Sequence, residues 1–474
     1  MFIRNAWYVA AWADEIGETP LARRICNEPV VLYRDRQNCV AALHDMCCHR
    51  GAPLHMGAIV EEGLQCGYHG LIFDRSGACV RVPGQTRILE RTRVRSFPAV
   101  EQDAFVWIWM GDPAKADVST IVPWPYHNDT KNWPHKHAMY PIKAAAMLMV
   151  DNLMDLTHLG YVHTTTIGGN PSQHVEAKMQ TERTPLGLKF TRWMLNSVPP
   201  PTYVKAVGFQ GRIDRCQRFE FIAPGSILQW TGAAETGAYR EGDTSGSPLE
   251  IRLFHGLTPE TDTSCFYFWS AANGFRQDEP AATEQLFAQV AAAFLEDKTV
   301  VEGQQLRLTE LGEAVLVDIV TDAARLHMRR TVERLLEEEA DGAGGGVARA
   351  RMRRCQPVRQ KNFPGLDVAR QQQARSLELR AATSLARLRG KHGRRAQAHD
   401  LLAPGYGSFT EGFDIADLKE AKVLIRLAPQ LKVLLTPYPA EEMVAWPVSP
   451  RVGNVKNNDP SLILPITGGG QVLQ

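Results

Sequence analysis

The sequence predicts an α+β protein with two folded regions and a tail, and three observations support this. Residues 1–112 consist of short β-branched and aromatic runs separated by Gly, Asn and Asp, which is typical of a β-rich domain. Residues 135–340 combine strand-like runs with long segments of helical periodicity, which predicts an antiparallel sheet with helices. A Gly-Ala-Gly-Gly-Gly breaker cluster at 342–346 then opens a tail of different character.

Composition limits the classes of partner and compartment. The chain has 474 residues, 44% of them hydrophobic, which is enough for sizeable cores. The formal net charge is +1, so no global field favours nucleic acid or a membrane surface. The nine cysteines are unevenly spaced, which fits a reducing cytoplasm. The N-terminus lacks the apolar stretch of a signal peptide, and no apolar run is long enough for a membrane span.

Individual elements follow from local pattern. In the first region the expected strands are Pro29–Arg34, Cys39–His44, Leu71–Phe73, Ala78–Val82 and Ala104–Trp109. The Pro-rich residues 113–134 predict a linker. In the second region the expected strands are Phe209–Phe221, Ser226–Trp230, Leu249–Leu257 and Ser264–Ser270, and the expected helices are Lys143–Tyr161, Glu284–Arg307 and Arg325–Ala340.

The most informative stretch carries two short arms, each with one Cys and one His. The first arm has Cys47 and His49, and the second has Cys66 and His69. Two thiolates on one iron and two imidazoles on the other form the ligand set of a Rieske [2Fe–2S] centre. Such a cluster accepts electrons from a flavin or ferredoxin-type reductase and passes them to a second site. Cys48 is an alternative to Cys47, but the C-x-H spacing favours Cys47.

A zinc site is the rival interpretation of this motif, because a Cys2His2 set also suits zinc. Zinc fingers usually place both Cys in one arm and both His in the other, whereas each arm here is mixed. The flanks also differ from a finger helix: Pro53 and Gly57 shape the first loop, and Gly67 and Gly70 let the second bend tightly. The pattern therefore favours the iron–sulfur cluster.

A second metal site is predicted around His158 and His163. A spacing of five residues puts the two side chains roughly 140° apart on an ideal helix. His163 therefore has to lie at a helix end or after a bulge and curl back, which Gly160 would allow. Two His and one carboxylate on one face of an iron leave positions open for O2 and substrate. The carboxylate is expected from Glu296 or Asp297, in an otherwise apolar helix.

Asp155 lies three residues before His158, so on a helix the two side chains are neighbours. A buried carboxylate there can orient a metal-bound imidazole and lie between two redox centres. Taken alone, the two histidines and Asp155 could instead be ordinary polar residues; the cluster motif upstream argues against that.

Together the two motifs resemble the oxygenase component of Rieske non-haem iron oxygenases. The Asn-Ala-Trp-Tyr-Val-Ala sequence at 5–10 and the Cys-Gly-Tyr-His-Gly-Leu arm at 66–71 resemble the vanillate O-demethylase branch, which includes dicamba monooxygenase-like enzymes. The resemblance covers about residues 1–340. The chain departs from it at Cys48, where the family commonly has proline.

The resemblance implies a Rieske domain at 1–112 and a helix-grip catalytic domain at 135–340. It implies Asp297 as the third iron ligand, Asn152 near the iron, and a homotrimer in which Asp155 bridges the cluster of one subunit and the iron of the next. It also implies a monooxygenase or demethylase that uses O2 and reductase-supplied electrons on an aromatic acid such as vanillate, in aromatic compound catabolism. The chain has no nicotinamide or flavin motif, so the reductase would be a separate protein.

Two further interpretations concern function and the tail. A Rieske electron carrier would lack the mononuclear iron. The tail divides into a Gly/Arg-rich linker at 341–370, a helical fragment at 371–428 and a Pro/Asn-rich end at 429–474. Its parts resemble the C-terminal fragments of TPR-type ATPases or adenylate cyclases and of SOS-response-associated peptidases. Residues 349–395 hold fourteen Lys/Arg against two Asp/Glu, which we interpret as a solvated or disordered segment rather than a nucleic-acid binder.

Overall fold

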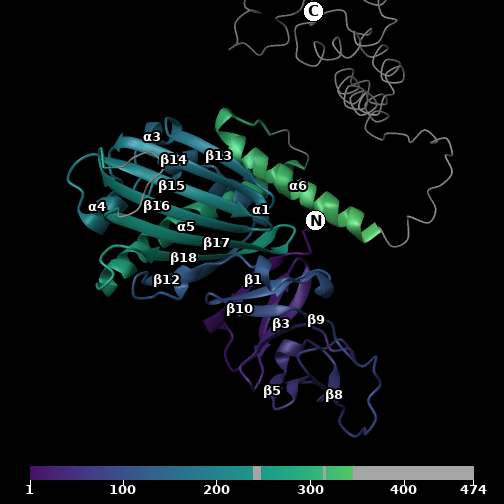
Figure 1. Cartoon of the computed structure of the whole chain (residues 1–474). Helices are drawn as coiled ribbons and strands as arrows, with labels where there is room; N and C mark the ends of the chain where they lie inside the picture. Colours follow the sequence, from purple (N-terminus) through teal and green to yellow (C-terminus); the bar gives the residue numbers. More distant parts are fainter. Residues whose placement is uncertain (239–246, 313–315, 345–474) are drawn as a thin grey trace, which may run out of the picture. The chain divides into compact units, whose positions relative to one another are not determined.

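The computed structural model describes residues 1–238, 247–312 and 316–344 (Figure 1). Within them, a β-rich N-terminal region precedes a large antiparallel sheet backed by helices, so the α+β prediction is confirmed. The last helix continues past Ala340 to Gly344, into the segment predicted as linker. The expectations for the remaining tail, including its basic stretch and both fragments, lie outside the described residues.

The N-terminal region consists of small antiparallel sheets, and all five strands predicted for it are present. One sheet joins β1 (Trp7–Trp12), β11 (Phe105–Trp109) and β10 (Ala99–Gln102). A second joins β2 (Leu21–Ile25), β3 (Glu28–Arg34), β4 (Val40–His44) and β9 (Ser96–Phe97). A third joins β5 (Ala58–Val60), β6 (Gly63–Gln65), β7 (Ile72–Phe73) and β8 (Cys79–Arg81), and it supports both Cys/His arms.

The residues between the two regions form short 3-10 turns: η3 (Pro113–Lys115), η4 (Val118–Thr120) and η5 (Pro125–His127). Asp112 and Asp117 cap the first two, each accepting a backbone N–H two residues ahead. Trp124 from this segment is buried, so the connection packs against the domains it joins.

The large sheet has seven antiparallel strands in the order β12-β18-β17-β16-β15-β14-β13. They are β12 (His135–Ile142), β13 (Lys178–Thr184), β14 (Gly187–Ser197), β15 (Ile213–Ile222), β16 (Ser226–Glu235), β17 (Leu249–Thr261) and β18 (Ser264–Asn273). The four predicted strands correspond to β15–β18. Strands β12, β13 and β14 were not predicted from the sequence. Strand β13 is an exposed, polar edge strand, and its sequence has no apolar alternation that would predict a strand.

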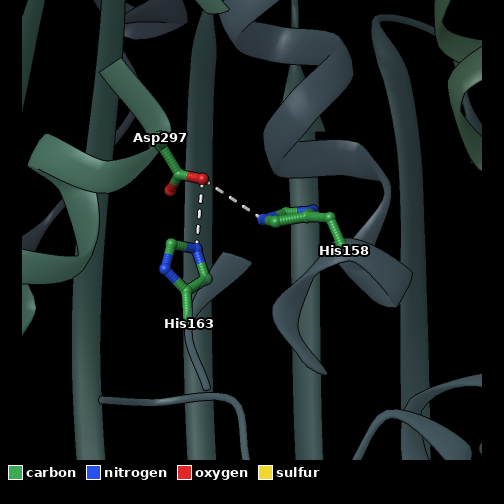
Figure 2. A group of neighbouring side chains, drawn as sticks. All are labelled: His158, His163 and Asp297. Atoms are coloured by element: carbon green, nitrogen blue, oxygen red, sulfur yellow. Dashed lines mark ion pairs between the residues drawn. The ribbon is translucent and has the colours of Figure 1, made fainter. Parts of the chain in front are cut away.

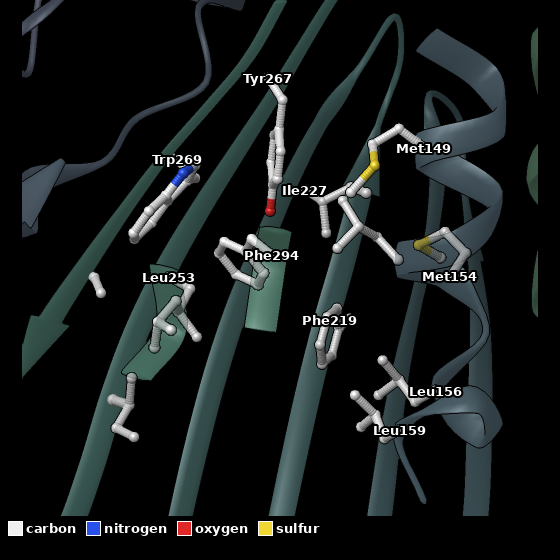
Figure 3. Close-up of a cluster of buried hydrophobic side chains, with 14 of the residues drawn as sticks. Met149, Met154, Leu156, Leu159, Phe219, Ile227, Leu253, Tyr267, Trp269 and Phe294 are labelled. Carbon is white, nitrogen blue, oxygen red and sulfur yellow. The ribbon is translucent and has the colours of Figure 1, made fainter. Parts of the chain in front are cut away.

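The two faces of this sheet bury different partners. Along β18, Tyr267 and Trp269 face the helices, whereas Phe266 and Phe268 pack against the N-terminal region, as the alternation of side chains along a strand requires. Figure 3 shows part of the helix-side core, with Phe294 from one helix and Met149 and Met154 from another lying over the strands. The opposite face joins the two regions, where Thr258 Oγ1 donates to the Val9 carbonyl at 2.6 Å.

The helices are α1 (Ala146–Met154), α2 (Leu159–Val162), α3 (Pro171–Val175), α4 (Pro201–Val207), α5 (Pro280–Leu311) and α6 (Ala323–Gly344), with a 3-10 turn η6 (Leu156–His158) between α1 and α2 and another, η7 (Val320–Asp322), before α6. The expected helices at 284–307 and 325–340 are confirmed as parts of α5 and α6. No helix among the described residues is long and apolar enough to cross a membrane.

Two element predictions were wrong in part. The helix expected over Lys143–Tyr161 is interrupted at Asp155, whose φ of −122° and ψ of 103° are extended, so α1 ends there. The strand expected over Phe209–Phe221 begins only at Ile213, because α4 ends in a left-handed cap at Gly208 and the chain needs residues 209–212 to reach the sheet.

Helix α6 ties the C-terminal part of the described chain to both helix α1 and the N-terminus. Arg329 pairs with Asp151 on α1. The Glu339 carboxylate accepts the backbone N–H groups of Arg4 and Asn5, at 2.7 and 2.8 Å. Figure 1 shows the N-terminus close to this helix. The described part of α6 therefore belongs to the folded body and fastens α1, which leads into the segment with His158 and His163.

Candidate functional site

The two Cys/His arms form matching loops at the end of the third small sheet. Cys47 and Cys66 are buried, at 2% and 1% exposure, whereas His49 and His69 are exposed and their ring centroids lie 4.6 Å apart. Cys48 is also exposed and lies outside the buried pair. The sulfurs therefore face the core and the imidazoles face solvent. A cluster needs this orientation to exchange electrons with another protein surface.

The same type of backbone hydrogen bond, from a glycine N–H to a cysteine carbonyl, closes both loops. The N–H of Gly51 donates to the Cys47 carbonyl, and the N–H of Gly70 donates to the Cys66 carbonyl. Both glycines have positive φ, +71° and +74°, which a residue with a side chain adopts at a cost. Burial raises the pKa of the Cys47 thiol to about 11, so the thiolate becomes the favoured form only when a metal is bound.

Replacing His69 by Cys should lower the reduction potential of the cluster. A third thiolate would put an anionic ligand where a neutral imidazole is expected, and all-thiolate [2Fe–2S] clusters have potentials lower by hundreds of millivolts. Potentiometric EPR titration measures the shift. The control is His55→Cys, at a half-buried residue of a nearby 3-10 turn (Leu54–Met56) that pairs with Asp45, and it should leave the potential unchanged. An unshifted potential in His69→Cys would remove His69 from the ligand set.

Three side chains from two distant segments form the second candidate site (Figure 2). The Oδ1 atom of Asp297 lies 3.3 Å from His158 Nε2 and 3.1 Å from His163 Nε2. The possible ligand atoms of all three lie within 4.8 Å of one another. His163 and Asp297 are buried and His158 is half-buried. Two imidazoles and one carboxylate in this arrangement suit a divalent first-row metal with open positions.

The local chain path explains how histidines five residues apart converge. Asp155 ends α1 and caps η6, so His158 closes that turn, and His163 is the C-terminal cap of the short helix α2. The expectation that His163 lies at a helix end is correct. The role suggested for Gly160 was wrong: it is helical, and a Cβ there would lie 2.4 Å from Pro171 Cα, so glycine permits close packing of α3 rather than a bend.

The role expected of the Asp155 side chain within its own subunit was also wrong. The ring nitrogen Nδ1 of His158 bonds to the backbone carbonyl of Asp155, not to its carboxylate. The carboxylate Oδ1 instead accepts the N–H and hydroxyl of Thr157, at 2.9 and 2.7 Å. The reason is the extended backbone at Asp155, which makes it an N-cap rather than a helical neighbour of His158.

Glu296 holds the other imidazole, a role the sequence analysis did not assign. Its Oε2 lies 2.6 Å from His163 Nδ1 and 3.3 Å from the Thr166 hydroxyl. This bond suits a proton on Nδ1, so that Nε2, the atom that faces Asp297, can bind a metal. The adjacent acidic pair at 296–297 was the available signal, because consecutive residues on a helix point about 100° apart and can serve two sides of one histidine.

Electrostatics within the triad favour a metal. Burial alone would raise the pKa of Asp297, but its contacts with His158 and His163 outweigh burial and hold the pKa at about 2. His163 Nε2 is buried and forms no hydrogen bond of good geometry with any described residue. The buried Asn152 Oδ1 is likewise without a partner there, while its Nδ2 donates to Asp297 Oδ1 at 3.0 Å. Orphaned acceptor atoms around a carboxylate fit a bound cation.

A pocket with about 50 Å³ of space for water-sized molecules lies beside the segments that carry the triad. Its lining includes Leu159, next in sequence to His158, and Phe294, one helical turn before Asp297. Most of the wall is aliphatic or aromatic, and the polar lining residues are Thr202, Tyr203, Gln217, Gln229 and Thr231. An apolar cavity with a few polar groups suits a small organic molecule of mixed character.

Two family matches cover the described regions. Residues 6–98 match the Rieske [2Fe–2S] domain, and residues 142–338 match the vanillate O-demethylase oxygenase C-terminal domain. The first match contains both Cys/His arms, and the second contains the His/His/Asp triad.

Curated relatives match over nearly their whole length. The chain is 40% identical over 345 residues to the iron–sulfur subunit of a toluene-4-sulfonate monooxygenase system from Comamonas testosteroni, covering 72% of this chain and 99% of that one. It is 36% identical over 358 residues to a vanillate O-demethylase oxygenase subunit from Pseudomonas sp. (strain HR199 / DSM 7063), covering 73% and 98%.

Solved structures agree with these matches. Dicamba monooxygenase bound to 3,6-dichlorosalicylic acid superposes with a TM-score of 0.68 at 34% identity, covering 72% of this chain and 99% of that one. Dicamba monooxygenase with non-haem iron and dicamba superposes with a TM-score of 0.61 at 33% identity and the same coverage.

Proposed function

Because the chain belongs to the Rieske non-haem iron oxygenase components that include vanillate O-demethylase, we propose that it oxidises a methyl or O-methyl carbon of an aromatic acid. Members of this family are oxygenase components with a Rieske [2Fe–2S] cluster and a mononuclear iron. Relatives act on toluene-4-sulfonate, vanillate and dicamba. On an O-methyl group, hydroxylation gives a hemiacetal that loses formaldehyde.

The observation that carries the proposal is the cavity beside the triad. Leu159 and Phe294 belong to both the cavity wall and the segments that carry His158 and Asp297, so a molecule in the cavity lies next to the iron site. The largely apolar lining suits an arene, and its amides and hydroxyls supply hydrogen bonds for a polar substituent. When bound, the cluster carries single electrons and the iron supplies redox chemistry with O2.

The residues present fit both metal groups. We assign Cys47, Cys66, His49 and His69 to the cluster, and His158, His163 and Asp297 to the iron. Within the iron site, Glu296 keeps the proton of His163 on Nδ1, and the Asp155 carbonyl does the same for His158. Asn152 Nδ2 orients the Asp297 carboxylate. With a metal bound, these contacts would hold the metal-facing atoms in place.

Electron delivery would occur between subunits of a homotrimer. His49 and His69 are exposed at the end of the N-terminal region, among the exposed side chains of Met46, Met56 and Tyr68. Such a surface suits docking on another subunit. We propose that it docks near Asp155 of the neighbour. A flavin or ferredoxin-type reductase, a separate protein, would reduce the cluster.

The test is turnover with a purified reductase and a panel of vanillate, other methoxybenzoates and toluene-4-sulfonate. We expect formaldehyde from at least one methoxylated acid, or an alcohol from the tolyl acid, in proportion to O2 consumed. Oxidation confined to neutral arenes would contradict the proposal. A Rieske electron carrier, the alternative function, would contain no mononuclear iron, so one such iron per cluster by metal analysis excludes it.

A further inference from the structure

One buried side chain next to the cavity has no use in the assignments above. Arg215 lies on β15 with its residue only 1% exposed. All three of its guanidinium nitrogens, Nε, Nη1 and Nη2, are buried without a hydrogen-bond partner among the described residues. The ring of Tyr203 packs against the guanidinium, with its centroid 4.8 Å from Arg215 Cζ. A buried guanidinium normally has a paired anion or several acceptors.

The neighbouring charges increase the need for an anion. Arg192 on β14 is also buried, at 3% exposure, but it donates to the carbonyls of Leu156 and His174, at 3.3 and 2.8 Å. Burial lowers the pKa of His174 to about 4, with Arg215 and Arg192 contributing, so that imidazole is neutral. No ion pair joins Arg215 to a carboxylate in the described residues. Two guanidiniums therefore share this region, and among the described residues Arg192 has hydrogen-bond acceptors whereas Arg215 has none.

The sheet register puts Arg215 beside the cavity floor. On β15 the side chains of Arg215 and Gln217 point to the same face, and Gln217 lines the cavity. Across the sheet, Gln217 pairs with the cavity residue Thr231, and Arg215 pairs with Ala233 in the next row. Tyr203 lines the cavity and also covers the guanidinium, so this ring separates Arg215 from the cavity contents.

This row lies at the end of the cavity away from the iron site. Phe294, Val290 and Leu286 line the cavity along α5, and they lead away from Asp297 by successive helical turns. On the sheet beneath, the cavity floor runs from Gln229 and Leu253 to Gln217 and Thr231, and Arg215 follows. A substrate whose reacting carbon faces the triad would thus point its opposite end toward Arg215.

We propose that Arg215 is the anion anchor of the substrate cavity and binds the sulfonate or carboxylate of an aromatic acid after a small displacement of the Tyr203 ring. The planar fork of a guanidinium donates two parallel hydrogen bonds to either group. Gln217, Thr231 and Thr202 line the same cavity and carry hydrogen-bond donors for such a group. The inference rests on the proposed function and narrows its substrates to arenes with an anionic group opposite the carbon to be oxidised.

The test is equilibrium binding to the iron-loaded protein without reductase, so it does not depend on turnover. The probes are toluene-4-sulfonate, its neutral analogue 4-tolyl methyl sulfone, and 4-methoxybenzoate. The variants are Arg215→Gln and, as a matched control, Arg218→Gln. Arg218 lies on the opposite face of the same strand, over the Trp230 ring at 4.6 Å, and outside the cavity.

We expect the wild type to bind the sulfonate at least about tenfold more tightly than the sulfone, and Arg215→Gln to weaken the two acids by roughly 10- to 100-fold. Binding of the sulfone should change little in either variant. Thermal unfolding of unliganded Arg215→Gln should occur at or above the wild-type temperature, because the substitution removes an unpaired buried charge.

Equal weakening of the sulfone and the acids by Arg215→Gln would overturn the inference, as would unchanged binding of the acids. If that variant fails to fold, the comparison of sulfonate with sulfone in the wild type decides: equal affinities reject the anchor. These failures differ from failure of the proposed function, in which no arene of either charge would be bound or oxidised.

Discussion

Replacing Asp297 by Asn should empty the mononuclear iron site while the cluster remains in place. The Asp297 carboxylate faces both His158 and His163, and an amide cannot supply its charge to a cation. We expect iron affinity at this site to fall by at least about 100-fold, and turnover with it. Iron per cluster by metal analysis and the EPR signal of the ferrous nitric oxide complex measure the loss.

The control for that experiment is Glu284→Gln on the same helix. Glu284 is exposed, pairs with Lys136 and lies several turns from the triad. It should retain both irons and normal turnover. Full mononuclear iron in Asp297→Asn would show that another acid, with Glu296 the nearest candidate, completes the ligand set.

Replacing Asp155 by Asn should separate electron transfer from metal binding. Asn is as good an N-cap as Asp, so the amide oxygen can still accept the Thr157 N–H and preserve η6. The His158 ring is held by the Asp155 backbone carbonyl, which the substitution does not alter. We therefore expect near-normal content of both irons and normal reduction of the cluster by the reductase.

Turnover of Asp155→Asn should nevertheless fall by roughly 10- to 100-fold. In the proposed trimer, the carboxylate accepts an imidazole N–H from the neighbouring cluster and stabilises the charge that develops there, which an amide does poorly. Single-turnover oxidation of the reduced cluster gives the transfer rate directly. Asp117→Asn, which alters an exposed N-cap of the same kind at η4, is the control and should leave that rate unchanged.

The two variants also test each other. If Asp155→Asn empties the mononuclear site while Asp297→Asn keeps it full, the two carboxylates have exchanged roles and Asp155 is the ligand. The geometry within one subunit argues against that outcome. Both hydrogen bonds to the Asp155 carboxylate come from Thr157, and they hold the carboxylate at the N-terminus of η6.

The structure also changes the reason for expecting near-normal iron in Asp155→Asn. A helical Asp155 would have its carboxylate beside His158, so an amide there would disturb the iron ligand directly. Because the backbone at Asp155 is extended, its carbonyl holds the His158 ring. The Asp155 carboxylate caps η6 and, in the proposed trimer, can also bond to a neighbouring subunit.

The sequence by itself determined the features that depend on short spacing and on periodicity. Two mixed Cys/His arms specify a cluster because ligands within a few residues of one another are brought together by a local turn. Long helices and strands with clear alternation, such as α5 and β18, follow from their own patterns. The edge strand β13 was missed because it is paired by its neighbour and buries almost nothing of its own.

Only the tertiary structure decided which groups meet across the chain. Glu296 and His163 are 133 residues apart, and the packing of α5 over the α2 segment brings them to 2.6 Å. No local pattern marks Arg215 as different from Arg218 three residues later; the sheet buries the first against Tyr203 and leaves the second over Trp230 on the other face. Residue type and spacing determine metal-ligand motifs that lie close together in the sequence. Burial and hydrogen-bond partners arise only when distant elements pack, and they decide which charged side chain is left to bind a ligand.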